Sequence, residues 1–168
     1  MNNETTESRK SLRGSKGEYL VLLQFALMLG FVVLPVYPQL SGTELFEKLT
    51  IMRWTALALF TSCALIFGAF GSYAIRKFLT PLPYPTEDNQ LITTGIYSIV
   101  RHPLYSGLLF AAFGWSVYSM SISHFILTGI ATLFFSYKAS REEQWLKDRH
   151  PEYTDYTRRV KKFIPWVY

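Results

Sequence analysis

Three long stretches of the chain carry no charged side chain, and they limit the folds that it can adopt. They run from residue 19 to 43, from 54 to 75 and from 103 to 137. The core of a bilayer needs about 20 apolar helical residues, so each of the first two stretches fits one membrane span. As a single helix, the third stretch would be roughly 52 Å long at about 1.5 Å per residue, which is too long for one span.

The middle of the third stretch, "SVYSMSISH" (Ser116–His124), is rich in serine and predicts a tight turn between two short spans. Only 17% of the residues are charged, against about 25% in soluble proteins. We therefore predict an all-α integral membrane protein with about four transmembrane helices and a cytoplasmic C-terminal helical tail. The expected regions are a disordered polar N-terminus (1–17), two transmembrane helices (18–75), and a transmembrane helical hairpin with its flanking segments and tail (76–168).

The distribution of basic residues predicts how these spans are oriented. Four precede the first span, three lie between the second and third, and eight follow the fourth, whereas the link between the first two spans has only two. Cytoplasmic segments carry an excess of Lys and Arg. We therefore expect a multi-pass protein with both termini and the segment 76–103 on the cytoplasmic side.

The stretch "GIYSIVRHPLYSG" (95–107) places polar groups directly before the third span. Pro103 suits the first turn of a helix, where its missing N–H has no partner to lose. His102 would then share a helix face with Tyr105 or Ser106, three and four residues further on. The free N–H groups of a first helical turn can bind an anion. The alternative is an interfacial anchor, in which Arg101 and His102 extend to water and Tyr105 lies in the aromatic belt.

An acidic pair, Glu142 and Glu143, follows the fourth span by about one helical turn. Adjacent helical residues point about 100° apart, so the two carboxylates are not expected to form a symmetric pair. Glu143 has a potential partner in Lys147, four residues further on. These residues either form an ordinary solvated turn or close a site at the membrane face.

Two other segments, one rich in proline and one that repeats an earlier motif, have less specific interpretations. The proline-rich "LTPLPYP" (79–85) favours a stiff, extended path, and it is either an ordinary loop or a cover over a pocket. The segment "RHPEY" (149–153) repeats "RHPLY" (101–105), but it leads into polar sequence, so we expect a helix end and a turn.

Several chemistries lack their sequence signals. The three histidines are scattered without the spacing of metal ligands, so no metal site is expected. The chain has neither a glycine-rich phosphate loop nor a nucleophile elbow. Its basic tail is more typical of a surface facing anionic membrane lipids than of a nucleic-acid site.

The order of these parts is more specific than any one of them. "LTPLPYP", "LITTGIYSIVRHPLYSG", two short spans, "EE" and "YTDYTRRVKKFIP" follow one another over roughly residues 76 to 165. This region resembles the isoprenylcysteine carboxyl methyltransferase and phospholipid methyltransferase group of membrane enzymes. The resemblance implies that S-adenosyl-L-methionine binds at the cytoplasmic face. The cofactor-binding residues that it implies are Gln90, Leu91, Ile92, Tyr97, Arg101, His102, Pro103, Tyr105, Glu142 and Glu143.

The resemblance also bears on the methyl acceptor, which it implies is a lipophilic small molecule or a prenylated substrate. The leading expectation is O-methylation of a prenylcysteine-like carboxylate. Members acting on carboxylates often have an arginine where this chain has Lys138, and lysine lacks the planar two-donor fork. We take His102 and Lys138 as the catalytic candidates, with His102 or a glutamate as the base if the acceptor is an amine. The alternatives are N-methylation of a phospholipid amine, an NADPH-dependent reductase similar to sterol reductases, and a scaffold without activity.

Overall fold

The computed structural model describes residues 18–38, 41–76 and 91–168. Within these ranges the chain is helical and forms no named strand, so the all-α prediction is confirmed. The N-terminal segment 1–17, Gln90 and the proline-rich segment 79–85 lie outside the described residues. The elements are α2 (Glu18–Val33), α3 (Glu44–Lys48), α4 (Thr50–Ile75), the 3₁₀ helix η1 (Gly95–Ser98), α5 (Pro103–Ser119), α6 (Ile122–Arg149) and α7 (Tyr153–Arg159).

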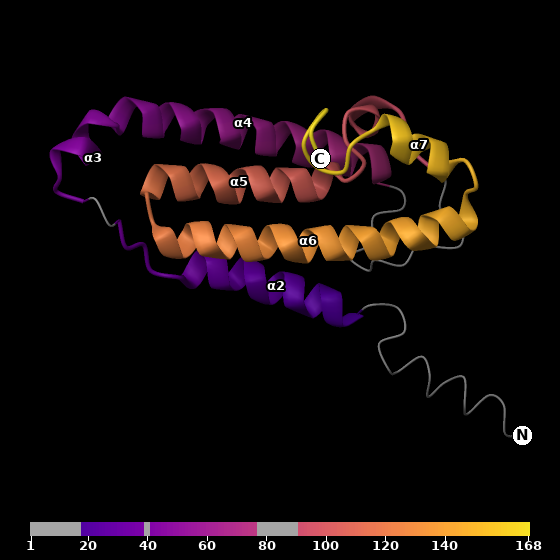
Figure 1. Ribbon diagram of the computed structural model, residues 1–168, viewed down its shortest axis with the longest axis horizontal. Coiled ribbons are helices and arrows are strands. Elements are labelled where there is room, and N and C mark those ends of the chain that lie inside the picture. The colour runs from indigo at the N-terminus through magenta and orange to yellow at the C-terminus, as the bar shows by residue number, and fades with distance from the viewer. Residues whose placement is uncertain (1–17, 39–40, 77–90) are drawn as a thin grey trace, which may run out of the picture.

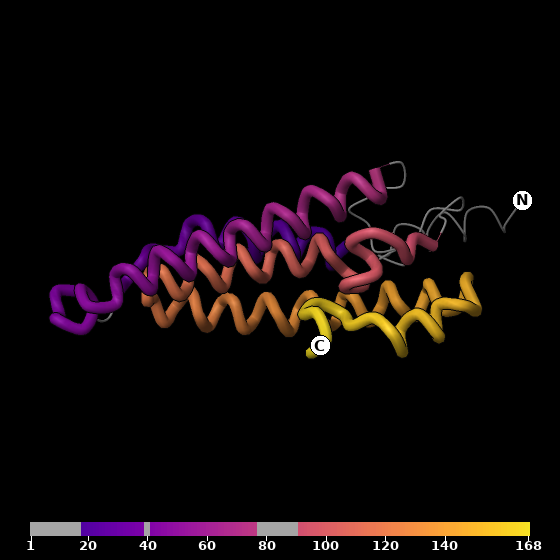
Figure 2. The backbone as a smooth tube through the Cα atoms, turned by 90° about the horizontal axis from the view of Figure 1, so that it is seen from above, coloured from indigo at the N-terminus to yellow at the C-terminus, as the bar shows by residue number. Residues whose placement is uncertain are grey.

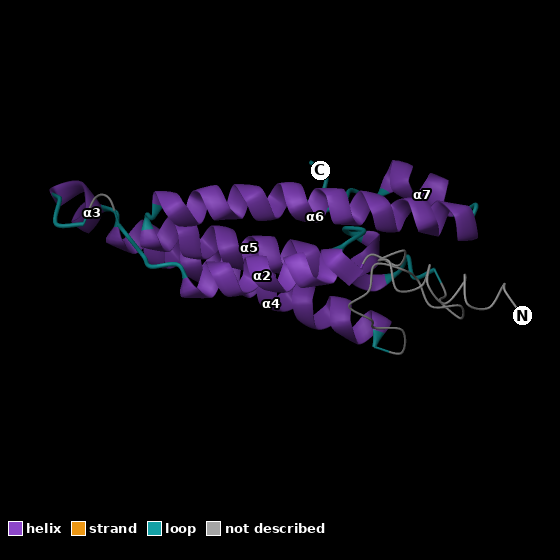
Figure 3. Ribbon diagram, turned by 90° about the horizontal axis from the view of Figure 1, so that it is seen from below, coloured by secondary structure: helices purple, strands orange, loops and turns teal. Residues whose placement is uncertain are grey.

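Four long helices lie side by side and form a bundle (Figures 1 and 2). Helix α4 packs on α5, α5 packs on α6, and α2 packs on α6. Figure 3 shows that short connections join α5 to α6 and α3 to α4. Among the described residues, α4 is the one helix that is both long and apolar enough to cross a membrane, and α2 is a shorter apolar helix. The number of four spans therefore stays a prediction.

Apolar side chains cover much of the outer surface of the bundle. Leu22 and Val32 on α2 are 72% and 82% exposed, and Ile51 on α4 is 82% exposed. Exposed apolar surfaces of this extent are rare on soluble monomers and mark contact with a partner or a membrane. This surface is the kind that a lipid-facing bundle needs.

Two turns lie where the sequence predicts them. Helix α5 ends at Ser119 and α6 begins at Ile122, with Met120 in the left-handed conformation (φ 49°) between them. The second repeat, 149–153, spans the end of α6 and the start of α7, as expected. The expected hairpin is thus present as two antiparallel helices, α5 and α6 (Figure 1).

Helices α4 and α5 approach closely because α5 carries glycine at the contact. A Cβ on Gly107 would lie 3.0 Å from the carbonyl oxygen of Ala64, and one on Gly114 would lie 2.7 Å from the Cβ of Phe60. Contacts this short leave no room for a side chain. The close packing fixes the start of α5 against α4, and the polar residues before α5 take their position from it.

The C-terminal segment 160–168 runs back from α7 to the start of α5. The backbone N–H groups of Arg101 and His102 donate to the carbonyl oxygens of Lys161 and Lys162, at 2.8 and 3.1 Å. Phe163 is buried beside α5 and α6. The tail is therefore helical in the last part of α6 and in α7, and afterwards it is irregular and ends in a turn over residues 164–168. It forms one wall around the start of α5.

Candidate active site

His102 lies at the N-terminus of α5, where Pro103 begins the helix as predicted. Its ring stacks on that of Tyr105, with centroids 5.6 Å apart and an interplanar angle of 8°. The Ser106 hydroxyl lies 3.1 Å from the carbonyl oxygen of His102 and 2.8 Å from that of Phe163. The helical spacing left open whether Tyr105 or Ser106 shares a helix face with His102. In the structure both of them do.

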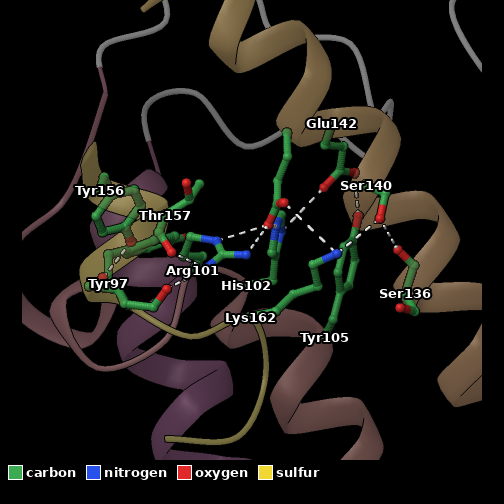
Figure 4. Close-up of polar contacts among 12 residues, drawn as sticks. Tyr97, Arg101, His102, Tyr105, Ser136, Ser140, Glu142, Tyr156, Thr157 and Lys162 are labelled. Atoms are coloured by element: carbon green, nitrogen blue, oxygen red, sulfur yellow. Dashed lines mark hydrogen bonds and ion pairs between the residues drawn. The ribbon is translucent and has the colours of Figure 1, made fainter. Parts of the chain in front are cut away.

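The imidazole of His102 lies between the two carboxylates of the acidic pair (Figure 4). Its Nε2 is 3.0 Å from Oε1 of Glu143, and its Nδ1 is 3.5 Å from Oε2 of Glu142. The other oxygen of Glu142 accepts a hydrogen bond of 2.5 Å from the hydroxyl of Tyr105. The two carboxylates thus point to different partners, as the helical geometry predicts.

Glu143 points into the protein, and the alternative of a solvated turn is wrong for this residue. Its side chain is only 8% exposed. Oε1 accepts from Nε of Arg101 at 2.9 Å and lies 2.8 Å from Nη2, and Oε2 lies 3.8 Å from Nζ of Lys162. The potential partner Lys147 is itself exposed. Three cationic groups converge on this one buried carboxylate.

The pKa shifts of the buried pair follow from these contacts. Burial by itself would lower the pKa of His102, but the hydrogen bonds and charges of Glu142 and Glu143 outweigh it and raise that pKa. Burial would raise the pKa of Glu143, but His102, Arg101 and Lys162 lower it to about 2. Both shifts favour the pairing of a Glu143 carboxylate with the protonated form of His102. In that form the imidazole has no lone pair, so it orients its neighbours by donating hydrogen bonds.

Arg101 uses its donors within the protein. Besides its bonds to Glu143, Nη1 donates to the carbonyl oxygens of Thr157 (3.3 Å) and Val160. The side chain therefore ties the start of α5 to α6 and to the C-terminal segment. These contacts indicate that Arg101 holds the start of α5 in place beside the acidic pair.

Lys138 reaches the same cluster from the membrane side. It is 1% exposed, its Nζ donates to Oε1 of Gln24 on α2 at 2.6 Å, and it lies 5.3 Å from the centroid of the Tyr105 ring. Sequence reasoning missed Gln24. Its signal is an amide in the apolar run of residues 19–36, which holds no other amide, because polar side chains at membrane depth are costly and mark functional sites.

The remaining expected residues surround this cluster unevenly. Leu91, Ile92 and Tyr97 are half-buried, whereas Pro103 is buried. Burial, followed by the charges of Tyr156 and Glu142, raises the pKa of Tyr97, which places it electrostatically near the acidic pair. The carbonyl oxygen of Tyr97 accepts from the hydroxyl of Tyr156 (Figure 4). The expected residues other than Gln90 therefore lie at or beside one end of the bundle.

The C-terminal segment contributes residues that were not predicted as site residues. Phe163 packs edge-on against His102, with ring centroids 6.0 Å apart. Lys162 bonds to Ser140 at 2.9 Å and faces Glu143. Both residues belong to the motif "YTDYTRRVKKFIP". The motif therefore indicated that this segment is part of the site, but it did not indicate which of its residues face His102 and Glu143.

The cluster suits the groups that S-adenosyl-L-methionine carries. Glu142 can face its ammonium or ribose hydroxyls, since a carboxylate accepts hydrogen bonds from both. The ring of Tyr97 can face its adenine or its sulfonium, the latter by cation–π attraction. The ring of Tyr105 is stacked on His102 and on Phe135 and so supports the cluster from within. Arg101 and Glu143 are bonded to each other and hold this arrangement in place.

We expect the stability of the protein to depend on pH through the pair of His102 and Glu143. The depressed pKa of Glu143 stabilises the fold above its ordinary value of 4.5, and this contribution is lost as the pH falls toward 2. The raised pKa of His102 stabilises it below the ordinary value of 6.5, and this contribution is lost as the pH rises through the folded-state pKa. The acid limb is worth roughly 3 kcal/mol, at about 1.4 kcal/mol per pKa unit.

Melting temperatures measured in detergent over a pH series would test this dependence. We expect a maximum between about pH 4.5 and 6.5. The variant Glu44→Gln is a control, since the Glu44 side chain is 82% exposed, and it should keep the acid limb. A melting temperature that stays constant between pH 4.5 and 2.5 would contradict the assigned pairing.

A family model and several known proteins resemble this chain, and all of those named below are methyltransferases. The family model described as phospholipid methyltransferase matches residues 50–153. A protein-S-isoprenylcysteine O-methyltransferase B of Arabidopsis thaliana is 35% identical over 83 residues, which cover 48% of this chain and 42% of that protein. A methanethiol S-methyltransferase of Pseudomonas deceptionensis is 27% identical over 119 residues, which cover 70% and 45%. A probable protein-S-isoprenylcysteine O-methyltransferase of Oryza sativa subsp. indica is 26% identical over 153 residues, which cover 89% and 77%.

The chain spans less than half the length of the first two of these relatives. The family match itself covers more than half of this chain and includes α4, α5, α6 and the cluster around His102. The resemblance drawn from the sequence motifs is confirmed. The chain belongs to the phospholipid methyltransferase family.

Proposed function

We propose that the protein is an S-adenosyl-L-methionine-dependent membrane methyltransferase that acts on a lipophilic acceptor. The observation that carries the proposal is the buried imidazole of His102 between Glu142 and Glu143, with Tyr105 stacked on it. The relatives named above are both O- and S-methyltransferases. Since their names share the transfer and differ in the acceptor, they support the reaction class more strongly than any one substrate.

Methyl transfer requires positioning and a dry site more than acid–base chemistry. When bound, S-adenosyl-L-methionine supplies a methyl group on a sulfonium whose departing thioether is neutral. Glu142 would hold the ammonium or the ribose, and Tyr97 would line the approach to the sulfonium. The imidazolium of His102 keeps Glu142 and Tyr105 in place. The C-terminal segment, with Phe163 buried against His102, excludes water from one side of the cluster.

The leading acceptor is a prenylcysteine-like carboxylate, which reacts without losing a proton. A carboxylate oxygen bonds to the methyl carbon as the bond from carbon to sulfur breaks, and the products are a neutral ester and a neutral thioether. Buried Lys138 supplies a positive charge for such a carboxylate. An amine acceptor would have to lose a proton, and His102 or a glutamate would be its base.

We propose the membrane arrangement on the grounds of charge and exposure. Four spans, with the site and both termini on the cytoplasmic side, agree with the excess of basic residues there. Helix α4 has one arginine at each end, with Arg53 in its first turn and Arg76 directly after its last turn. The end of α4 that Arg76 follows is the bundle end from which α5 starts, which is the proposed cytoplasmic end (Figure 1). A lipophilic acceptor then arrives sideways from the bilayer, the cofactor arrives from water, and region 76–168 brings them together.

Two measurements on the protein in lipid nanodiscs test the proposal. S-adenosylhomocysteine should raise the melting temperature, whereas NADPH should not, because ligands stabilise the state that binds them. Radiolabelled methyl groups should pass to a prenylcysteine analogue in preference to phosphatidylethanolamine or methanethiol. Stabilisation by NADPH would favour the reductase, and failure of both ligands would favour a scaffold. Transfer to phosphatidylethanolamine alone would keep the reaction class and replace the acceptor.

A further inference from the structure

The turn formed by residues 164–168 exposes most of its apolar side chains. Trp166 and Val167 are 88% and 71% exposed, and Ile164 and Tyr168 are exposed as well. Backbone bonds close the turn, since the N–H groups of Val167 and Tyr168 both donate to the carbonyl oxygen of Ile164 at 3.1 Å. Trp166 has a left-handed backbone (φ 61°), which a residue other than glycine rarely adopts. A closed turn that presents its largest ring outward is typical of a contact surface.

The position of this turn along the bundle is fixed by its contact with α6. The hydroxyl of Tyr168 lies 2.5 Å from that of Ser136, which belongs to the third uncharged stretch. The neighbour of Ser136, Phe135, stacks on Tyr105 in the first turn of α5, with ring centroids 4.9 Å apart. One helical turn before Ser136, Leu133 is exposed. The turn therefore lies level with the start of the third predicted span, and it continues the apolar surface of the bundle.

Basic side chains lie next to this turn, where the chain leaves α7 and runs back along the bundle (Figure 1). Arg158, Arg159 and Lys161 are exposed. The N–H group of Arg101, two residues before α5, donates to the carbonyl oxygen of Lys161 at 2.8 Å, so this part of the segment lies just outside the predicted span. Asp155 lies 3.3 Å from Arg158 and offsets one of the three charges. The group therefore keeps an excess of positive charge.

The segment that carries these residues has an inner and an outer face. On its inner face, Phe163 is buried and Lys162 lies 3.8 Å from Glu143. On its outer face, the flanking residues Lys161 and Ile164 are exposed. Along the outer face, cations come first and apolar side chains follow toward the predicted span. The cytoplasmic surface of a bilayer has the complementary order, with anionic headgroups outside and apolar chains inside, and tryptophan favours the boundary between them.

We infer that the outer face of residues 158–168 is a membrane-surface site selective for anionic phospholipids. Trp166 and Val167 enter the boundary between headgroups and acyl chains, and Arg158, Arg159 and Lys161 contact the anionic headgroups. The bilayer surface then holds the outer face of the segment whose inner face forms one wall around the start of α5. The inference goes beyond the proposed methyl transfer and does not depend on it.

Quenching of tryptophan fluorescence by brominated lipids tests both parts of the inference. Brominated phosphatidylserine or brominated phosphatidylcholine is added at the same mole fraction to phosphatidylcholine nanodiscs that hold the protein. The difference between wild-type protein and Trp166→Phe isolates the signal of Trp166 from that of the other three tryptophans. Both lipids should quench this signal, and phosphatidylserine should associate at least fivefold more tightly, since one basic residue near an anionic surface contributes about 1 kcal/mol. The preference should weaken between about 0.1 and 1 M salt, because the Debye length falls from about 10 to 3 Å.

Neutralising the three cations separates the effect of charge from that of insertion. The triple variant Arg158→Gln, Arg159→Gln, Lys161→Gln should keep the quenching by phosphatidylcholine and lose the preference for phosphatidylserine. The control is Lys147→Gln, which removes another exposed cation 11 residues beyond Ser136 on α6. It lies roughly 16 Å further along the helix at about 1.5 Å per residue, which exceeds the Debye length at physiological salt, so this variant should keep the preference. Melting temperatures in detergent should stay close to wild type in both variants, because all the substituted side chains are exposed.

Several results would overturn the inference. Quenching of Trp166 by aqueous acrylamide but by neither lipid would place the turn in water. Protection from acrylamide and from both lipids would mean that a protein surface, such as a second copy of the chain, covers the turn. Equal association of the two lipids with wild-type protein, or a preference that survives in the triple variant, would show that these cations form no headgroup site. The proposed function is judged separately, by stabilisation with S-adenosylhomocysteine and by methyl transfer.

Discussion

Glu143→Gln is expected to destabilise the protein strongly, whereas Glu142→Gln should leave the fold intact and weaken cofactor binding. Glu143 is buried and faces Arg101, His102 and Lys162. Removing one partner of a buried ion pair typically costs 3–5 kcal/mol, because the remaining charges stay buried without compensation. The glutamine can still accept one hydrogen bond, but it cannot neutralise the imidazolium and the guanidinium.

Glu142 has a different environment and should respond differently. Its side chain is 16% exposed, and its carboxylate oxygens face Nδ1 of His102 and the hydroxyl of Tyr105. The loss of one charged hydrogen bond to a ligand costs about 1.5–3 kcal/mol, so affinity for S-adenosylhomocysteine should fall about 10- to 150-fold. Melting curves with and without S-adenosylhomocysteine, recorded for both variants, give the comparison. Equal melting temperatures in the two variants would show that the buried position of Glu143 has no energetic consequence.

Phe163→Ala should be the second large effect, although this residue lies outside the expected binding residues. Its side chain is 2% exposed and packs in the core cluster with Leu20, Phe134 and Phe135. Its ring lies edge-on to His102, with centroids 6.0 Å apart. Truncating a buried phenylalanine usually costs 3–5 kcal/mol. We expect both the free energy of unfolding and the affinity for S-adenosylhomocysteine to fall, because the same ring supports the imidazole.

The matched control for Phe163 lies three residues further along the same segment. Trp166 is 88% exposed, so Trp166→Ala removes a large aromatic ring that has little contact within the protein. It should change the free energy of unfolding by no more than about 0.5 kcal/mol, the usual range for surface substitutions. Its melting temperature in detergent should therefore stay close to that of the wild-type protein. Similar losses for Phe163→Ala and Trp166→Ala would mean that the segment does not wall the site as described.

Much of the local structure could be predicted because it depends on neighbouring residues. Pro103 begins α5, the serine-rich turn separates α5 from α6, and Arg149–Tyr153 ends a helix. In each case a short-range steric or hydrogen-bonding preference decides the conformation. The guanidinium of Arg141 lies 5.7 Å from the ring centroid of Trp145, four residues further along α6, which is a spacing at which helical side chains meet.

The sequence predicted which end of the bundle carries the polar residues, but it did not predict which of them are buried and paired. Helical geometry already shows that Glu142 and Glu143 point apart, yet nothing in their spacing shows which of them is buried. That choice depends on Arg101 and Lys162, which lie 42 residues before and 19 residues after Glu143 in the sequence. The same holds for Gln24, whose partner Lys138 lies on another helix, far along the chain.

By itself, the sequence determined the helical class, the helix ends near Pro103 and Ser119, the family, and the bundle end at which the polar residues gather. These features follow from hydrophobic patterning, from local sterics and from the order of motifs along the chain. Only the tertiary structure decided that His102 lies between two carboxylates, that Glu143 is buried against Arg101 and Lys162 whereas Glu142 is more exposed, and that Phe163 packs on His102 while Gln24 pairs with Lys138. The physical reason is that burial and charge pairing depend on side chains brought together from α2, α5, α6 and the C-terminal segment, and local sequence does not encode distances between them.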